Sequence, residues 1–94
     1  MKLKFSKNAI KFLKKLSKKE QLKIKQKLKD LDSSITKNNT IPFQELDIKT
    51  LVGSWKDYLR LRVGKIRIIF KIDLVNNEIY IYDIDYRGNI YTKN

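Results

Sequence analysis

The 94-residue sequence contains neither cysteine nor histidine. These two absences exclude disulfide bonds, cysteine nucleophiles and the thiolate and imidazole ligands on which zinc, haem and iron–sulfur sites depend. Only carboxylates remain as candidate metal ligands. We therefore expect a protein that works without a metal ion or another cofactor.

Long apolar runs are also missing. No stretch approaches the roughly 18 apolar residues that a membrane-spanning helix requires. The first five residues, MKLKF, alternate lysine with apolar side chains and do not form the apolar core of a signal peptide. The sequence has no internal repeat and no linker, and its length suits one compact domain spanning residues 1–94. We expect a cytoplasmic protein with no membrane contact.

Acidic residues are scarce relative to basic ones: 22 Lys and Arg stand against 10 Asp and Glu, and the net charge is +12. Such an excess attracts polyanions. Residues 1–40 carry thirteen lysines, and for any single lysine a solvated helix face is the simpler interpretation. The four arginines lie together in the second part of the chain, at Arg60, Arg62, Arg67 and Arg87. Because the guanidinium fork binds phosphate in a bidentate way, this clustering indicates selection for geometry as well as for charge.

Two amphipathic helices are expected in the first 40 residues. Ser6 is a suitable N-cap for the first helix. Residues 17–20, SKKE, have the pattern of a capping box at the start of a second helix, which should run from about residue 18 to the mid-thirties. The residues expected on the buried sides are Ala9, Phe12, Leu13 and Leu16 in the first helix and Leu22, Ile24, Leu28, Leu31 and Ile35 in the second.

Strands are expected in the remainder of the chain. Residues 36–42 are expected to form a loop that closes at Pro42, and beyond it the apolar period changes to two. Residues 58–63, 66–72 and 79–85 are expected strands, with a turn at Asn76-Asn77 and a further short strand at residues 2–5. Helices followed by a strand meander favour an α+β domain. We expect two N-terminal helices packed on one face of a mostly antiparallel sheet of about four strands.

A two-residue turn at Gly64-Lys65 would set the register of the central hairpin. Glycine supplies the positive φ that a type II′ turn requires at its first central position. In that register Arg62 lies opposite Arg67, and the alternating side chains separate into two faces. The core face would hold Leu59, Leu61, Val63, Ile66, Ile68 and Phe70, and the other face Tyr58, Arg60, Arg62 and Arg67.

Two arginines directly opposed across a hairpin repel each other, at a cost of up to about 1 kcal/mol unless an anion lies between them. One possible source of that anion is internal, because Asp83 and Asp85 share one parity with Arg87 on the last strand. The other source, which we favour, is the phosphate of an RNA.

The aromatic residues divide into candidates for RNA binding and residues expected to pack in the protein. Tyr58, Tyr86 and Tyr91 are candidates for stacking on unpaired bases. Tyr80 and Tyr82 have the parity of Ile84 and are expected to pack against the helices, and Trp55 is most simply a rim or core residue.

Two segments resemble known signatures. Residues 53–70, GSWKDYLRLRVGKIRIIF, resemble the central signature of the RelE/ParE toxin family, and residues 86–91, YRGNIY, resemble its C-terminal signature. With the helix pair, the resemblance covers essentially the whole chain. It implies the toxin of a type II toxin–antitoxin system. The implied activity is that of a ribosome-dependent endoribonuclease, an mRNA interferase that cuts messenger RNA without metal by attack of the 2′-hydroxyl on the adjacent phosphate.

The resemblance also implies the catalytic residues. Arg67 and Arg87 would stabilise the transition state, Tyr91 would orient or stack on the cleaved nucleotide, and Arg60 and Arg62 would engage the phosphate and assist proton transfer. Such a reaction needs a base for the hydroxyl, positive charge on the developing phosphorane and an acid for the leaving oxygen.

Two features depart from the family pattern. Many relatives have histidine where this chain has Tyr86, and arginine is a poor proton acceptor because its guanidinium stays protonated. The expected RNA-binding residues are Lys56, Tyr58, Lys65 and Tyr86. Of these, Lys56 and Lys65 are the two candidates for the general base.

Two other functions suit the same scaffold. A ParE-like protein inhibits DNA gyrase and cuts nothing, and a non-catalytic relative would serve only as an antitoxin-binding module. The combination of Arg67, Arg87 and Tyr91 favours the ribonuclease. The expected partners are a cognate antitoxin whose acidic segment wraps the basic surface, the ribosome with its messenger RNA, and ribosomal RNA through the basic helices.

Overall fold

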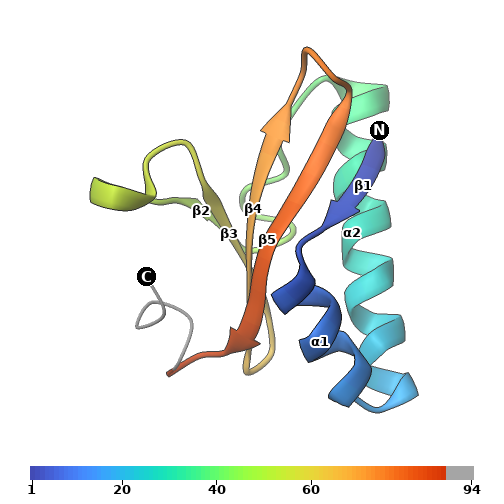
Figure 1. Cartoon of the computed structure of the whole chain (residues 1–94). Helices are drawn as coiled ribbons and strands as arrows, with labels where there is room; N and C mark the ends of the chain where they lie inside the picture. Colours follow the sequence, from blue (N-terminus) through green and yellow to red (C-terminus); the bar gives the residue numbers. More distant parts are fainter. Residues whose placement is uncertain (89–94) are drawn as a thin grey trace.

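A computed structural model of the chain describes residues 1–88. The elements follow in the order β1 (Lys2–Phe5), α1 (Lys7–Lys15), α2 (Lys18–Asn38), β2 (Ile48–Thr50), a 3-10 turn η1 (Gly53–Trp55), β3 (Leu59–Val63), β4 (Ile66–Asp73) and β5 (Glu78–Tyr86). The strands form one sheet in the order β1-β5-β4-β3-β2, in which only β1 and β5 run parallel. Both helices lie on one side of this sheet, and the loop that carries η1 projects on the other side (Figure 1).

The expected α+β class and the helix-on-sheet arrangement are confirmed, with one strand more than expected. The additional strand is β2, which pairs with β3 and contributes one buried residue, Ile48, opposite Leu61. A strand of three residues is too short to show a period of two in the sequence.

Both predicted helix caps are present. The Ser6 hydroxyl accepts a hydrogen bond from the amide of Ala9 and donates one to the carbonyl of Tyr82, which fixes the start of α1 to β5. The Ser17 hydroxyl accepts from the Glu20 amide at 3.2 Å. Within residues 1–88, neither helix combines the length and apolarity needed to cross a membrane.

The second helix is longer than expected. It continues through residues 36–38, which the sequence assigned to a loop, and ends where Asn39 adopts a left-handed conformation with φ 55°. Asparagine tolerates this conformation better than most residues, so it terminates the helix in place of glycine.

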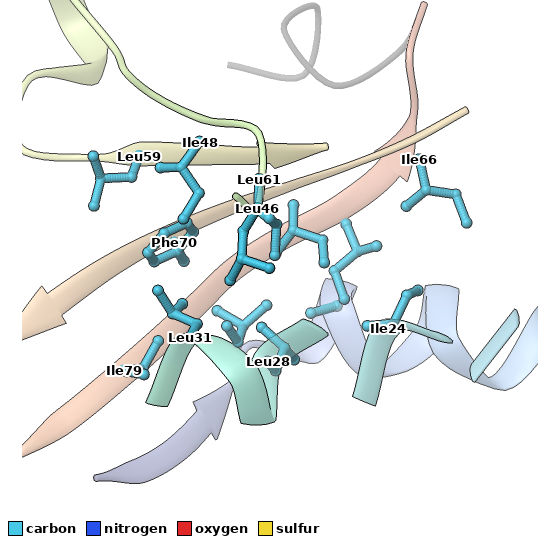
Figure 2. Packing of buried hydrophobic residues seen from close by; sticks show 14 of the residues in the cluster. Ile24, Leu28, Leu31, Leu46, Ile48, Leu59, Leu61, Ile66, Phe70 and Ile79 are labelled. Atoms are coloured by element: carbon cyan, nitrogen blue, oxygen red, sulfur yellow. The ribbon is translucent and has the colours of Figure 1, made fainter. Parts of the chain in front are cut away.

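The core lies between α2 and the sheet (Figure 2). Ile24, Leu28 and Leu31 on α2 are almost completely buried, at the spacing of one helix face. The prediction that Leu22 is buried is wrong, since its side chain is 64% exposed. Two residues correspond to about 200° of helix rotation, which turns Leu22 away from the face that carries Ile24.

The central hairpin has the predicted register. Arg62 lies opposite Arg67, and Val63 lies opposite Ile66. Gly64 has φ 60°, as the first central position of a type II′ turn requires. The chemistry of this turn therefore fixes which side chains share a face.

A β-bulge interrupts the pairing of β4 and β5. Phe70 lies opposite Ile81 and Ile69 lies opposite Asp83, so Tyr82 is an extra residue with no counterpart on β4. Such an insertion changes which parity of the strand points toward the core.

The bulge overturns one prediction from the sequence. Ile84 is buried in the core as expected, but Tyr80 and Tyr82 do not pack against the helices. Their rings lie on the opposite side of the sheet, where Tyr82 contacts Trp55. A period of two cannot reveal an extra residue within a strand.

Candidate functional site

The side of the sheet away from the helices, here called the outer face, carries the arginines of β3 and β4. Neighbouring strands place these residues in rows: Lys49, Arg60, Ile69 and Asp83 form one row, and Arg62, Arg67 and Asp85 form the next. The outer face thus brings Arg60, Arg62 and Arg67 together with both predicted acids.

Asp47, in the loop before β2, holds two of the arginines. Its carboxylate contacts Arg60 Nη2 at 3.1 Å through Oδ1 and Arg62 Nε at 3.2 Å through Oδ2. Its carbonyl accepts hydrogen bonds from the Arg62 amide at 3.2 Å and from Arg60 Nη2 at 3.3 Å. One residue therefore links both side chains.

Arg60 lies beneath this contact and is only 6% exposed. Its Nε has no hydrogen-bond partner among residues 1–88. A buried guanidinium depends strongly on its counter-charge, because an uncompensated charge away from water is costly. Arg60 therefore orients Asp47, while the side chain of Arg62, which is 44% exposed, reaches solvent.

Arg67 is also buried, at 6% exposure, but in a different way. Its Nη1 donates to the carbonyl of Gly64 at 2.8 Å and to that of Ile66 at 3.2 Å. Asp85 lies opposite Arg67 in the pairing of β4 with β5. The hairpin turn therefore holds one edge of this guanidinium in place.

Arg87 follows β5 directly. Its amide donates to the carbonyl of Lys65 at 2.9 Å, so the backbone of Arg87 lies beside the hairpin turn, and its side chain is exposed. Lys65, also exposed, occupies that turn. The structure thus brings Arg87 and Lys65 to the same end of the sheet as Arg62 and Arg67.

Three other predicted site residues do not belong to the rows of arginines on the outer face. Tyr86 pairs with Ile66 and packs edge-on against Phe12 of α1 at 5.1 Å, on the helix side of the sheet. Lys56 follows η1 and is exposed. Tyr91 lies outside the described residues.

Asp47 is the residue that sequence reasoning missed. The expected internal counter-charges were Asp83 and Asp85 on β5, whereas the carboxylate that pairs with Arg60 and Arg62 comes from the loop before β2. A positive φ of 54° at Asp47 is compatible with an acidic residue in a turn. A single aspartate in a loop gives no periodic signal, so the sequence alone does not reveal it.

Four aromatic side chains pack together beside the arginines. Ring centroids lie 5.8 Å apart for Trp55 and Tyr58, 5.5 Å for Trp55 and Tyr82, 5.3 Å for Tyr58 and Tyr82, and 6.3 Å for Tyr80 and Tyr82. Lys71 Nζ lies over the Tyr58 ring, 5.6 Å from its centroid. Burial, and then the neighbouring Tyr82 and Tyr80 hydroxyls, raise the pKa of Tyr58 above its ordinary value.

The end of the outer face near the hairpin turn is suited to anions. Three arginines, Arg60, Arg62 and Arg67, lie there with three acids, Asp47, Asp83 and Asp85. Lys65 in the turn and Arg87 directly after β5 add positive charge at the same end of the sheet. In residues 1–88, no group of three or more carboxylates converges in a way that could hold a metal ion. The groups present there can bind a phosphodiester and stabilise added negative charge on it.

Solved structures with a similar fold include toxins and toxin–antitoxin complexes. A chain of the archaeal RelE–RelB complex from Pyrococcus horikoshii shares 25% identity, with a TM-score of 0.68 over 94% of this chain and 96% of that one. The isolated Escherichia coli RelE toxin superposes with a TM-score of 0.68 at 19% identity, over 98% and 92% of the two chains. A chain of the Staphylococcus aureus YoeB–YefM complex gives 0.65 at 21% identity, over 93% and 97%.

The sequence itself also identifies a family. Comparison with curated protein sequences gives no match. The family described as "ParE toxin of type II toxin-antitoxin system, parDE" matches residues 3–91, which is nearly the whole chain. This match, with the fold it accompanies, shows that the chain belongs to the RelE/ParE family of toxins from type II toxin–antitoxin systems.

Proposed function

We propose that this toxin is a ribosome-dependent endoribonuclease that cleaves messenger RNA and so stops translation in the cytoplasm. The observation that carries the proposal is the cross-strand pair of Arg62 and Arg67 on the outer face, with the Arg67 guanidinium held by two backbone carbonyls. A cation fixed before the substrate arrives stabilises developing charge without reorganisation, which is the largest contribution in many enzymes.

The proposed reaction is metal-independent. The 2′-hydroxyl of the messenger attacks the adjacent phosphate, its proton passes to a base, and the leaving 5′-oxygen receives a proton. Arg67 and Arg87 bind the non-bridging oxygens, and Arg62 binds the phosphate from β3. We assign Arg60 a positioning role, because its guanidinium is paired with both the carboxylate and the carbonyl of Asp47. Tyr91 is proposed to stack on the cleaved nucleotide.

Lys65 is the better placed of the two proposed bases. It occupies the turn that joins the strands of Arg62 and Arg67, and its carbonyl holds the backbone of Arg87. Lys56 follows η1. Replacing Lys65 by Met is therefore expected to reduce cleavage by about 10²-fold or more, whereas Lys56→Met should leave cleavage largely unchanged. Single-turnover cleavage on programmed ribosomes measures both, and full activity of Lys65→Met would remove Lys65 as the base.

The partners proposed are an antitoxin, the ribosome and its messenger RNA. The related structures include complexes named for RelB and YefM antitoxins, and an acidic segment of such a protein would be attracted by the net charge of +12. The helix α2, which carries exposed lysines, lies on the side of the sheet opposite to the outer face. We propose that α2 contacts ribosomal RNA while the outer face holds the messenger.

A second candidate, inhibition of DNA gyrase, is favoured by the description of the matching family, which names ParE. The two activities separate cleanly with purified protein. We expect the toxin to block in vitro translation and to leave gyrase-catalysed supercoiling unaffected. Blocked supercoiling with unaffected translation would establish the gyrase inhibitor, and no effect on either would indicate a module that only binds its antitoxin.

A further inference from the structure

The four packed aromatic residues lie on the outer face, on the same surface as the arginines. This aromatic platform consists of Trp55, Tyr58, Tyr80 and Tyr82, each of them only partly buried. None of its three phenolic hydroxyls donates a hydrogen bond to another residue within 1–88. The platform therefore offers ring surface and polar groups to solvent, although part of its packing attaches the loop of η1 to the sheet.

Basic side chains border the platform. Lys71 lies over the ring of Tyr58 and opposite Tyr80 in the strand pairing. A hollow of about 590 Å³ opens beside Tyr58 and Tyr80 and is bordered by Lys71, Lys4 and Lys7. Ser6, Asn76 and two carboxylates, Asp73 and Glu78, complete its polar lining. Glu78 pairs with Lys4 at 3.9 Å, which leaves Lys7 and Lys71 as the cations nearest to the rings. The hollow thus combines ring surface with positive charge and with hydrogen-bonding groups.

The platform and the arginine pair are aligned along β4. Arg67 and Lys71 are both on the outer face and are separated by four residues, which corresponds to about 13 Å of strand. Proteins that bind single strands combine a basic path for the backbone with aromatic rings on which successive bases stack. The outer face repeats that combination.

We propose that the aromatic platform is a second nucleotide subsite, which holds an unpaired base of the same RNA strand that is cut at the arginines. The base stacks on Tyr80 and Tyr58 at the hollow, and Lys71 and Lys7 hold the flanking phosphate. The subsite rests on the proposed ribonuclease function. It extends that function, because the toxin would bind single-stranded RNA directly, without the ribosome.

The single tryptophan gives a direct measurement. Trp55 belongs to the platform, so binding of RNA there should quench its fluorescence. The probe is a single-stranded RNA oligonucleotide with 2′-O-methyl groups, which cannot be cut because the attacking hydroxyl is blocked. We expect saturable quenching, and Tyr80→Ala should weaken binding by about fivefold or more, in line with the loss of one base stack. Lys71→Glu should also weaken binding.

Two matched controls lie outside the platform. Phe43→Ala removes a more exposed aromatic ring from another loop, and Lys29→Glu makes the same charge reversal on α2. Phe43→Ala should bind the oligonucleotide like the wild type. Lys29→Glu measures the general weakening that any charge reversal causes, and Lys71→Glu should weaken binding more than Lys29→Glu does. If Tyr80→Ala lowers the melting temperature but leaves RNA affinity unchanged, the four rings serve only to pack the loop, and the subsite is refuted.

The outcomes also distinguish the subsite from the ribonuclease. If the wild type cuts messenger on the ribosome but the oligonucleotide neither quenches Trp55 nor depends on Tyr80, the platform proposal fails and the ribonuclease stands. If the oligonucleotide quenches Trp55 with the expected dependence on Tyr80 but no messenger is cut, the subsite stands and the ribonuclease fails.

Discussion

Arg67→Ala is expected to reduce messenger cleavage by about 10²- to 10³-fold, the usual effect of removing one fixed donor from a charge-stabilising site. The reason is the geometry of its guanidinium, which the backbone carbonyls of Gly64, in the hairpin turn, and of Ile66, at the start of β4, hold in place before the substrate binds. A mobile surface cation would have to be ordered during the reaction and would contribute less. The rate is measured in single-turnover cleavage on ribosomes saturated with toxin.

Two further variants serve as controls that distinguish a loss of catalysis from a loss of folding. Arg67→Lys keeps the charge but cannot reproduce the planar fork, so we expect an intermediate loss of activity. Lys29→Ala removes an exposed lysine from α2 and should leave the rate on a bound ribosome unchanged. Each variant needs a normal circular dichroism spectrum and melting curve. A folded Arg67→Ala protein that cuts at the wild-type rate would exclude Arg67 from the catalytic site.

Asp47→Asn is expected to destabilise the fold by about 1–3 kcal/mol, the cost of leaving a buried charged group without its partner. The carboxylate contacts both Arg60 and Arg62, and Arg60 is almost fully buried. Asparagine retains the left-handed backbone that φ 54° requires, so the change removes the charge without adding backbone strain. For a domain of this size the melting temperature should fall by roughly 4–8 °C per kcal/mol.

A double-mutant cycle tests whether the loss arises from the ion pair. Combining Asp47→Asn with Arg60→Met removes both charges of the pair. The double variant should therefore lose less free energy of unfolding than the two single variants lose together. Urea unfolding at equilibrium gives the four free energies. A coupling energy within about 0.5 kcal/mol of zero would mean that Asp47 and Arg60 act independently, and would contradict the positioning role assigned to Arg60.

The features that were predictable from the sequence are those with a short-range chemical cause. Gly64 requires a particular turn, the turn fixes the register, and the register places Arg62 opposite Arg67. Ser6 and Ser17 similarly mark the starts of both helices through hydrogen bonds to nearby amides. In each case the determining contact lies within a few residues of the chain.

The features that were missed depend on contacts between distant parts of the chain. Asp47 pairs with Arg60, thirteen positions later, and nothing around it in the sequence indicates a partner. The extra residue at Tyr82 reverses the parity of β5, so Tyr80 was assigned to the wrong face although the core position of Ile84 was correct. The contribution of Tyr80 and Tyr82 to the aromatic platform was therefore not foreseen, whereas Tyr58 was predicted to stack on bases.

The central claim is that the arginines of the outer face cut messenger RNA on the ribosome. The most direct test maps the 5′ ends of a translated messenger after addition of wild-type toxin or of the Arg67→Ala, Arg87→Ala double variant. We expect cuts in phase with the codons for the wild type and their loss for the folded double variant. Cuts that persist at the same positions and rate in the double variant, or a wild-type protein that makes none, would contradict the claim.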